Sequence, residues 1–265
     1  MLLLLPLTLA AQTDVDLDSE WGARFSASIE KKFAKGLHVS AEEEVRMDDN
    51  FRSLNRLHTT IAIDYKALPW LKVGMGYALI NAYNADSSRF KSPRHRLMVD
   101  ATGSMIVGDW RFALKERLQA TYRTGSYNNY QMSQPLLALK SRISAKYRGW
   151  RTWEPYVAFE IRTTLNAPKI DAHFDGTNYL TPEGNKKGEP GWFLEGFDGC
   201  YANRYRSSLG VEWKINYSNA LKIYVLADFV TDKVVDANAE GTKLKSYTKE
   251  KGFVGTIGAE YVFSF

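Results

Sequence analysis

The side chains most able to bind a ligand are charged residues that recur at alternate positions along several segments. The basic ones are Arg94, Arg96, Arg111, Lys115, Arg117, Lys140, Arg142 and Lys146. The acidic ones on the same face are Glu42, Glu44, Asp100, Glu160, Glu212 and Glu260. If the basic residues line one side of a pore and the acids line the side facing it, the basic side can attract small anionic solutes. The same charges can instead pair with one another and hold a narrow interior rigid. The pattern leaves both interpretations open.

Motifs for metal, cofactor or covalent chemistry are missing from the sequence. The single cysteine, Cys200, cannot form an intramolecular disulfide or a multi-cysteine zinc site. No phosphate-binding glycine loop, zinc motif or nucleophile elbow occurs. We therefore expect no metal, no cofactor and no catalytic residue.

Composition narrows the class of protein. A charged fraction of 25% is that of an ordinary folded chain, which argues against disorder. The net charge of +5 is mild for 265 residues and does not favour nucleic acid as a partner. Outside the first dozen residues no stretch of about 18 apolar residues occurs, which excludes helical membrane spans.

The elements that carry these charges are predicted to be strands with two unlike faces. Trp21, Ala23 and Phe25 alternate with Gly22 and Arg24, and the same period of two recurs along the chain. About eleven such runs of roughly ten residues fit tilted strands that cross a bilayer. They lie at 21–29, 37–47, 57–65, 71–83, 97–107, 110–122, 137–147, 157–165, 209–217, 221–229 and 253–265.

Connections between the runs alternate between short and long, as in an up-and-down outer-membrane barrel. The long ones are expected at 48–53, 84–93, 124–135, 166–204 and 231–252. The fold class is therefore all-β, an up-and-down antiparallel transmembrane β-barrel. Because eleven strands would leave the first and last running the same way, we expect about 12 strands, with a pairing segment at 14–19, or alternatively 10. Such a segment would start the chain in the periplasm.

Two further features favour the membrane over a soluble barrel. Aromatic residues stand near the ends of the apolar runs, where bilayer interfaces favour them, Trp110 and Tyr147 among them. Residues 1–11 form an apolar run followed by small residues, which predicts a secretory signal peptide. Residues 12–265 are expected to form a single outer-membrane barrel domain.

Several short motifs resemble those of a known family. The ending Gly258–Phe265, with alternating aromatics and a terminal Phe, resembles the signal by which outer-membrane barrels are recognised for insertion. Trp21 before Glu30–Lys32, followed in order by the motifs at 73–77, 94–96, 115–123 and 204–206, resembles the bacterial outer-membrane family catalogued as domain of unknown function 2490. The resemblance implies a barrel and supplies no activity or catalytic residue.

The expected role is a narrow channel or structural barrel with a charged, salt-bridged lumen in the outer membrane of a Gram-negative bacterium. The expected partners are outer-membrane lipid, the barrel assembly machinery through the last strand, and small anionic solutes, with the barrel a monomer. One alternative is a lipid-processing enzyme, because His38 and Ser40 have the spacing found in outer-membrane phospholipases. Both, however, occupy alternate positions of the strand whose side chains are expected to face the lumen. The other alternative is a barrel that binds partners through its surface loops.

Overall fold

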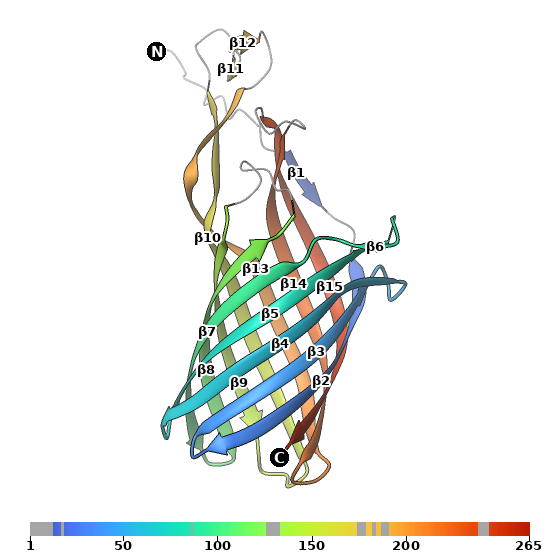
Figure 1. Ribbon diagram of the computed structural model, residues 1–265, viewed down its shortest axis with the longest axis vertical. Helices are drawn as coiled ribbons and strands as arrows, with labels where there is room; N and C mark the ends of the chain where they lie inside the picture. The colour runs from blue at the N-terminus through green and yellow to red at the C-terminus, as the bar shows by residue number, and fades with distance from the viewer. Residues whose placement is uncertain are drawn as a thin grey trace, which may run out of the picture.

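The computed structural model is an all-β chain, drawn in Figure 1. It describes residues 13–16, 19–85, 87–125, 133–173, 179–181, 184–186, 191–237 and 244–265. The predicted signal peptide lies outside the described residues. No helix in the described part of the chain is long and apolar enough to cross a membrane.

Eleven long strands form the wall of the barrel. They are β2 (Glu20–Ala34), β3 (Leu37–Asp48), β4 (Ser53–Leu68), β5 (Leu71–Asn84), β7 (Arg94–Val107), β8 (Trp110–Arg123), β9 (Leu136–Tyr147), β10 (Trp153–His173), β13 (Gly191–Lys214), β14 (Asn219–Ala237) and β15 (Leu244–Ser264). Four short strands lie outside the wall: β1 (Thr13–Asp16), β6 (Arg89–Phe90), β11 (Tyr179–Thr181) and β12 (Gly184–Lys186).

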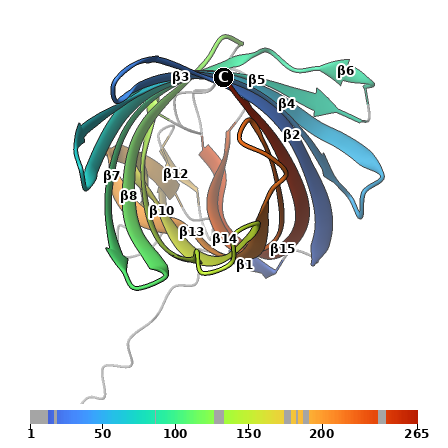
Figure 2. The same ribbon diagram turned by 90° about the horizontal axis from the view of Figure 1, so that it is seen from below.

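Neighbouring wall strands are antiparallel, and the barrel closes through one parallel pair, β15 with β2. This seam runs from Val254 opposite Glu20 to Ser264 opposite Glu30, and Figure 2 shows the resulting ring from below. The inference that two terminal strands running the same way cannot close the barrel is therefore wrong. A parallel ladder satisfies the backbone groups of both edges, so an odd number of strands leaves no open edge.

The extra strand expected near residues 14–19 is present as β1, but it does not add a twelfth wall position. It pairs in parallel with Thr248–Lys251 of β15, on the same edge that β2 occupies further along. The barrel fold is confirmed, with eleven wall strands plus this one. The sequence predicts that this segment starts the chain at the periplasmic end, where the short turns lie. That prediction is wrong, because β1 lies at the end with the long connections.

Two connections predicted as long loops are largely strand. β10 and β13 stay paired as far as His173 opposite Gly191, and β14 and β15 as far as Ala237 opposite Leu244. Both hairpins rise beyond the barrel wall (Figure 1). Register shifts along β10, including one between Thr164 and Ala167, break the two-residue period that the sequence prediction relied on.

Exposure decides which face of the sheet is inside. Apolar side chains in the middle of strands point outward and are largely uncovered, with Val99 59% and Leu209 67% exposed. Polar side chains of the other parity are buried in the interior, among them Asp228 at 2% and Gln119 at 3% exposure. A continuous apolar outer surface of this kind needs lipid to cover it. The barrel is therefore of the transmembrane kind, with a polar lumen.

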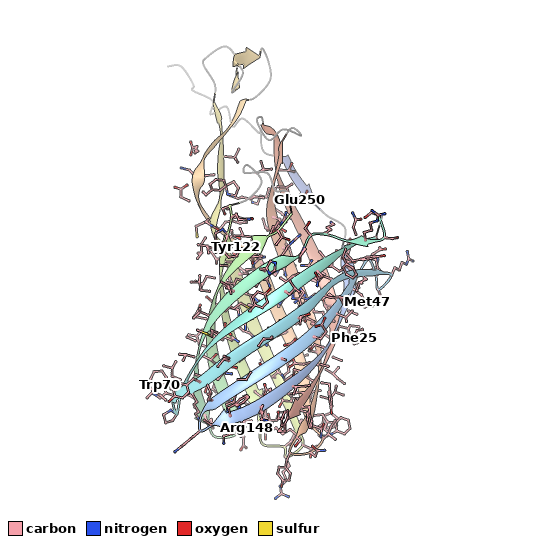
Figure 3. The ribbon with its side chains drawn as sticks, viewed as in Figure 1. Phe25, Met47, Trp70, Tyr122, Arg148 and Glu250 are labelled. Atoms are coloured by element: carbon pink, nitrogen blue, oxygen red, sulfur yellow. The ribbon has the colours of Figure 1, made fainter. Side chains whose placement is uncertain are left out.

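Aromatic side chains gather where the strands meet the short turns, which we call the short-turn end. Trp110 packs on Tyr147 with ring centroids 5.2 Å apart, and Trp153 stacks on Trp213 at 5.2 Å and 9°. Trp70 stands at the same end (Figure 3) and is 56% exposed. Such rings suit the interface between hydrocarbon and water, so they mark one border of the membrane belt.

A row of alternating tyrosine and glycine crosses four strands on the lumen side. Tyr156 lies opposite Gly210, Gly210 opposite Tyr224, and Tyr224 opposite Gly258. Each ring lies over a position without a side chain, and a Cβ at Gly210 would come within 2.8 Å of the Tyr156 ring and 2.7 Å of the Ile223 carbonyl oxygen. The glycines thus give room for rings that fill the lumen and fix the register.

We expect Gly210→Val to destabilise the barrel by about 1–3 kcal/mol, because the added side chain overpacks against backbone as well as ring. The measurement is the urea midpoint of the shift in gel mobility between folded and unfolded protein. Gly103→Val is the control, because a Cβ there meets nothing within 4 Å. An equal loss in both variants would contradict the role given to this row.

Candidate functional site

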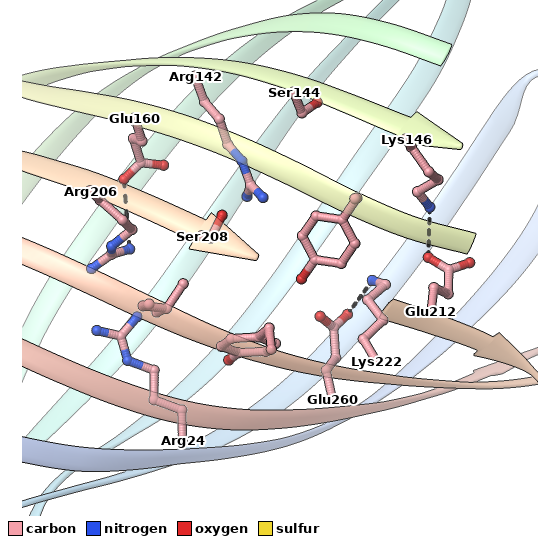
Figure 4. A pocket seen from close by; sticks show the side chains of 13 residues that line it. Arg24, Arg142, Ser144, Lys146, Glu160, Arg206, Ser208, Glu212, Lys222 and Glu260 are labelled. Carbon is pink, nitrogen blue, oxygen red and sulfur yellow. Dashed lines mark hydrogen bonds and ion pairs between the residues drawn. The ribbon is translucent and has the colours of Figure 1, made fainter. Parts of the chain in front are cut away.

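The lumen of the barrel is the candidate site, and two cavities occupy its middle. One, of about 310 Å³, lies on the side of β9, β10, β13, β14, β15 and β2, and its lining is shown in Figure 4. The other, of about 380 Å³, is lined from β2 through β10 and by β13. Both share the side chains of Arg24, Arg142, Glu160 and Arg206. These four residues form a charged layer between the cavities.

Four of the eight predicted basic residues lie within 4.0 Å of a carboxylate: Lys115, Arg117, Lys140 and Lys146. Asp100 accepts from Arg117 Nε and Nη2 at 2.6 and 2.7 Å, and Lys115 Nζ lies 2.9 Å from the same carboxylate. Lys140 Nζ lies 2.8 Å from Glu160. Each of these pairs joins adjacent strands. Arg117 lies directly opposite Asp100, whereas Lys115 and Lys140 reach diagonally to Asp100 and Glu160.

Near the short-turn end, Lys146 contacts two acids and continues the same pattern. Its Nζ lies 2.7 Å from Glu212 and 3.4 Å from Glu154. Lys222 Nζ lies 2.8 Å from Glu260, and Figure 4 shows this pair beside the first. Acids on β10 and β13 thus flank the basic strands and pair with Lys140 and Lys146. The wider arrangement, a basic wall opposite a more acidic one, stays a prediction.

The other predicted basic residues have no carboxylate within 4.0 Å among the described residues: Arg94, Arg96, Arg111 and Arg142. Arg96 Nε donates to Thr121 at 3.1 Å, and Arg111 donates to Ser104 at 3.4 Å. Arg142 belongs to the layer between the two cavities. These residues leave the lumen with positive charge that no described acid cancels.

Two predicted acids lie in the larger cavity. Glu44 accepts from Arg46 Nε at 2.6 Å and lies 3.8 Å from His58 Nδ1. Glu42 lines the same cavity. Ser40, of the suspected hydrolase pair, also faces this cavity. A site for cleaving membrane lipid would have to face the bilayer instead.

The more buried of the two ion pairs that share two hydrogen bonds in the described residues, Arg206 with Asp228, was not among the predicted site residues. Asp228 accepts from Arg206 Nε and Nη2 at 2.6 and 2.8 Å, while Arg24 and Arg204 lie at 3.6 and 3.9 Å from it. Arg206 also lies 3.7 Å from Glu160, which links this network to Lys140. Parity could have placed these residues in the lumen, since Arg204 and Arg206 alternate with Tyr205. Their pairing follows only from the register of β13 against β14.

Metal chemistry finds no support in the described part of the chain. No three His, Cys, Asp or Glu side chains there form a group able to hold a metal ion. Cys200 is exposed and makes no disulfide. The charged side chains that line the lumen can attract, bind or repel charged solutes.

An apolar outer belt, aromatic rings at one border and a charged lumen define an outer-membrane-type β-barrel. The chain belongs to the family described as "Protein of unknown function (DUF2490)", which matches residues 21–178. This agrees with the resemblance carried by the sequence motifs.

Comparison with known proteins adds little beyond the family. No curated protein matches the chain. The structure is similar to one described as outer-membrane expressed OmpT of Vibrio cholerae, with a TM-score of 0.34 and 12% sequence identity. That similarity covers 80% of this chain and 57% of the other.

Proposed function

We propose that the protein is a monomeric barrel of the Gram-negative outer membrane whose narrow, charged lumen passes small anionic solutes. The observation that carries this proposal is the surplus of arginine in a lumen otherwise held together by ion pairs. Arg142 lines both cavities and has no carboxylate within 4.0 Å among the described residues, so the charged layer between the cavities favours an anion. The cavities of about 310 and 380 Å³ support a small solute.

The orientation follows from the connections. The short turns and the C-terminus share one end of the barrel (Figure 1), which we assign to the periplasm, and the long connections then face outside. Lipid covers the apolar belt, and the assembly machinery binds the last strand. Residues 12–265 act as one domain behind a signal peptide at 1–11. Neither nucleic acid nor a cofactor is part of this proposal.

A structural barrel is the second candidate function, and the ion pairs favour it. Lys115, Arg117, Lys140 and Lys146 all meet carboxylates, from the adjacent strands and, for Lys146, also from β13 beyond β10, as expected for a filled, rigid lumen. The lipid-processing alternative has less support, since Ser40 faces the lumen cavity. In the surface-loop alternative the long connections would carry the binding residues, and 126–132, 174–178 and 238–243 of these connections lie outside the described residues.

Conductance in planar bilayers tests the proposal. We expect small current steps with a reversal potential that favours chloride over potassium, because the uncancelled guanidinium groups attract anions. Arg142→Gln should lower this preference, whereas Lys35→Gln, in the exposed turn between β2 and β3, should not. Large steps or cation preference would contradict the proposal. The absence of steps would reject the channel and favour the structural barrel.

A further inference from the structure

Arginines lie directly opposite one another at the end of the lumen nearer the long connections, which we call the long-loop end. Arg24, Arg46 and Arg56 are successive partners across β2, β3 and β4. Arg162 lies opposite Arg204 across β10 and β13. Like charges directly opposite in a sheet destabilise it. So many facing guanidinium groups in one place need negative charge to offset their repulsion.

The described carboxylates supply only part of that charge. Glu44 is engaged by Arg46, and both oxygens of Asp228 are engaged by Arg206. Arg24 and Arg204 stay beyond hydrogen-bond distance of Asp228, at 3.6 and 3.9 Å.

Two further arginines meet neutral partners only, within the part of the chain that the structure describes. Arg56 donates to the Asn55 side chain and Arg96 to Thr121 at 3.1 Å. Asp48 lies near Arg56, but its oxygens accept from Ser53 at 2.6 Å and from Asn55. The local balance is therefore positive.

The arginines converge on shared space. A cavity of about 150 Å³ is lined by Arg24, Arg46, Arg56 and Arg204, together with the carboxylates of Glu20, Asp48 and Asp228. The 380 Å³ cavity is lined by Arg24, Arg46 and Arg96, so both cavities contact the same two residues. At about 30 Å³ per water molecule, the smaller cavity has room for one small anion and a few waters.

Buried nitrogen atoms without hydrogen-bond partners occur at these cavities or directly opposite an arginine that lines one. Within the described residues, the Nε atoms of Arg162 and Arg204 are buried and meet no hydrogen-bond acceptor. His58, which lines the 380 Å³ cavity, also has a buried Nε2 without a partner there. Buried guanidinium N–H groups are costly to leave unsatisfied, and an oxyanion offers several acceptor oxygens at once.

We propose that Arg24, Arg46, Arg56 and Arg204, the arginine cluster, bind a multiply charged oxyanion of the phosphate class in the cavity of about 150 Å³. Planar guanidinium groups match the oxygens of phosphate with paired hydrogen bonds, which chloride cannot accept in the same geometry. The site deepens the proposed function, on which it rests for the route of the anion from the long-loop end.

Binding to the purified full chain in detergent tests the site. Inorganic phosphate and pyrophosphate, titrated at constant ionic strength, should raise the unfolding temperature, while chloride at the same ionic strength should not. Arg56→Gln should weaken the binding about tenfold or more, because it removes one charge-assisted contact. Arg96→Gln should weaken it less, because Arg96 lines only the 380 Å³ cavity. Neither change strands a carboxylate, so both variants should fold.

Arg148→Gln is the matched control, because Arg148 lies at the short-turn end (Figure 3) and its acid, Glu154, keeps Lys146 and Lys214. Phosphate binding should be unchanged in that variant. No stabilisation by either phosphate, equal stabilisation by chloride, or equal weakening in Arg148→Gln would overturn the site. Binding without conductance would leave the site standing and reject the channel, and conductance without binding would do the reverse.

Discussion

Asp228→Asn is expected to lower the free energy of unfolding of the barrel by about 3–5 kcal/mol, the range for breaking a buried ion pair by removing one partner. Asp228 is 2% exposed and accepts both hydrogen bonds of Arg206, with Arg24 and Arg204 close behind. Without its charge, three guanidinium groups face one another in the lumen. The urea midpoint of the gel-mobility shift measures the loss.

Asp64→Asn is the control for this prediction. Its partner Lys72 lies 3.3 Å away, but the lysine side chain is 48% exposed, so the pair is worth only about 0–1 kcal/mol. In addition, Asp228→Asn combined with Arg206→Gln should cost less than the sum of the two single changes, because the pair acts as a unit. Equal midpoints for Asp228→Asn and Asp64→Asn would show that the network does not hold the barrel together.

Deletion of Phe265 is the second change expected to have a large effect, and it should reduce assembled barrel to a small fraction while export continues. The Phe265 amide donates to the Glu30 carbonyl at 3.0 Å, and its carbonyl accepts from the Lys32 amide at 3.3 Å. The ring lies 5.6 Å from Phe263 and beneath Lys31. The deletion therefore removes the last rung of the seam as well as the terminal aromatic of the strand that we propose as the insertion signal.

Phe33→Ala serves as the comparison, since it removes an exposed aromatic at the same end and leaves the seam hydrogen bonds in place. The measurement is the amount of heat-modifiable protein in the outer-membrane fraction, beside the total exported protein. Wild-type levels after deletion of Phe265 would contradict the importance of the last residue.

The sequence was sufficient to predict the strands where the period of two is unbroken. The run expected at 110–122 is found as Trp110–Arg123, and that at 37–47 as Leu37–Asp48. β10 and β13 were underestimated because bulges near Ala167 interrupt the alternation while the backbone ladder continues. Backbone pairing beyond the bilayer needs no apolar face, so a hydropathy pattern does not reveal it.

Closure and the ion pairs were beyond the reach of the pattern for a different reason. Alternation tells which face a residue occupies, but not which strand lies beside it or in which direction that strand runs. The parallel seam and the Arg206–Asp228 pair both depend on that register. The alternation of polar and apolar residues predicted which side chains face the lumen. It gave no means of telling Arg117, which pairs with Asp100, from Arg96, which meets no described carboxylate.

The most direct test of the account is a crosslink across the seam. Phe25 and Ala259 are partners on β2 and β15. In a Cys200→Ser background, Phe25→Cys with Ala259→Cys should be joined within one chain by a short bis-maleimide. The boiled product should then migrate differently from the uncrosslinked chain, because nearly the whole polypeptide is a closed loop. Phe25→Cys with Ala101→Cys, on β7, should give no such product. Crosslinks formed only between two chains, or none at the seam, would contradict a closed single-chain barrel.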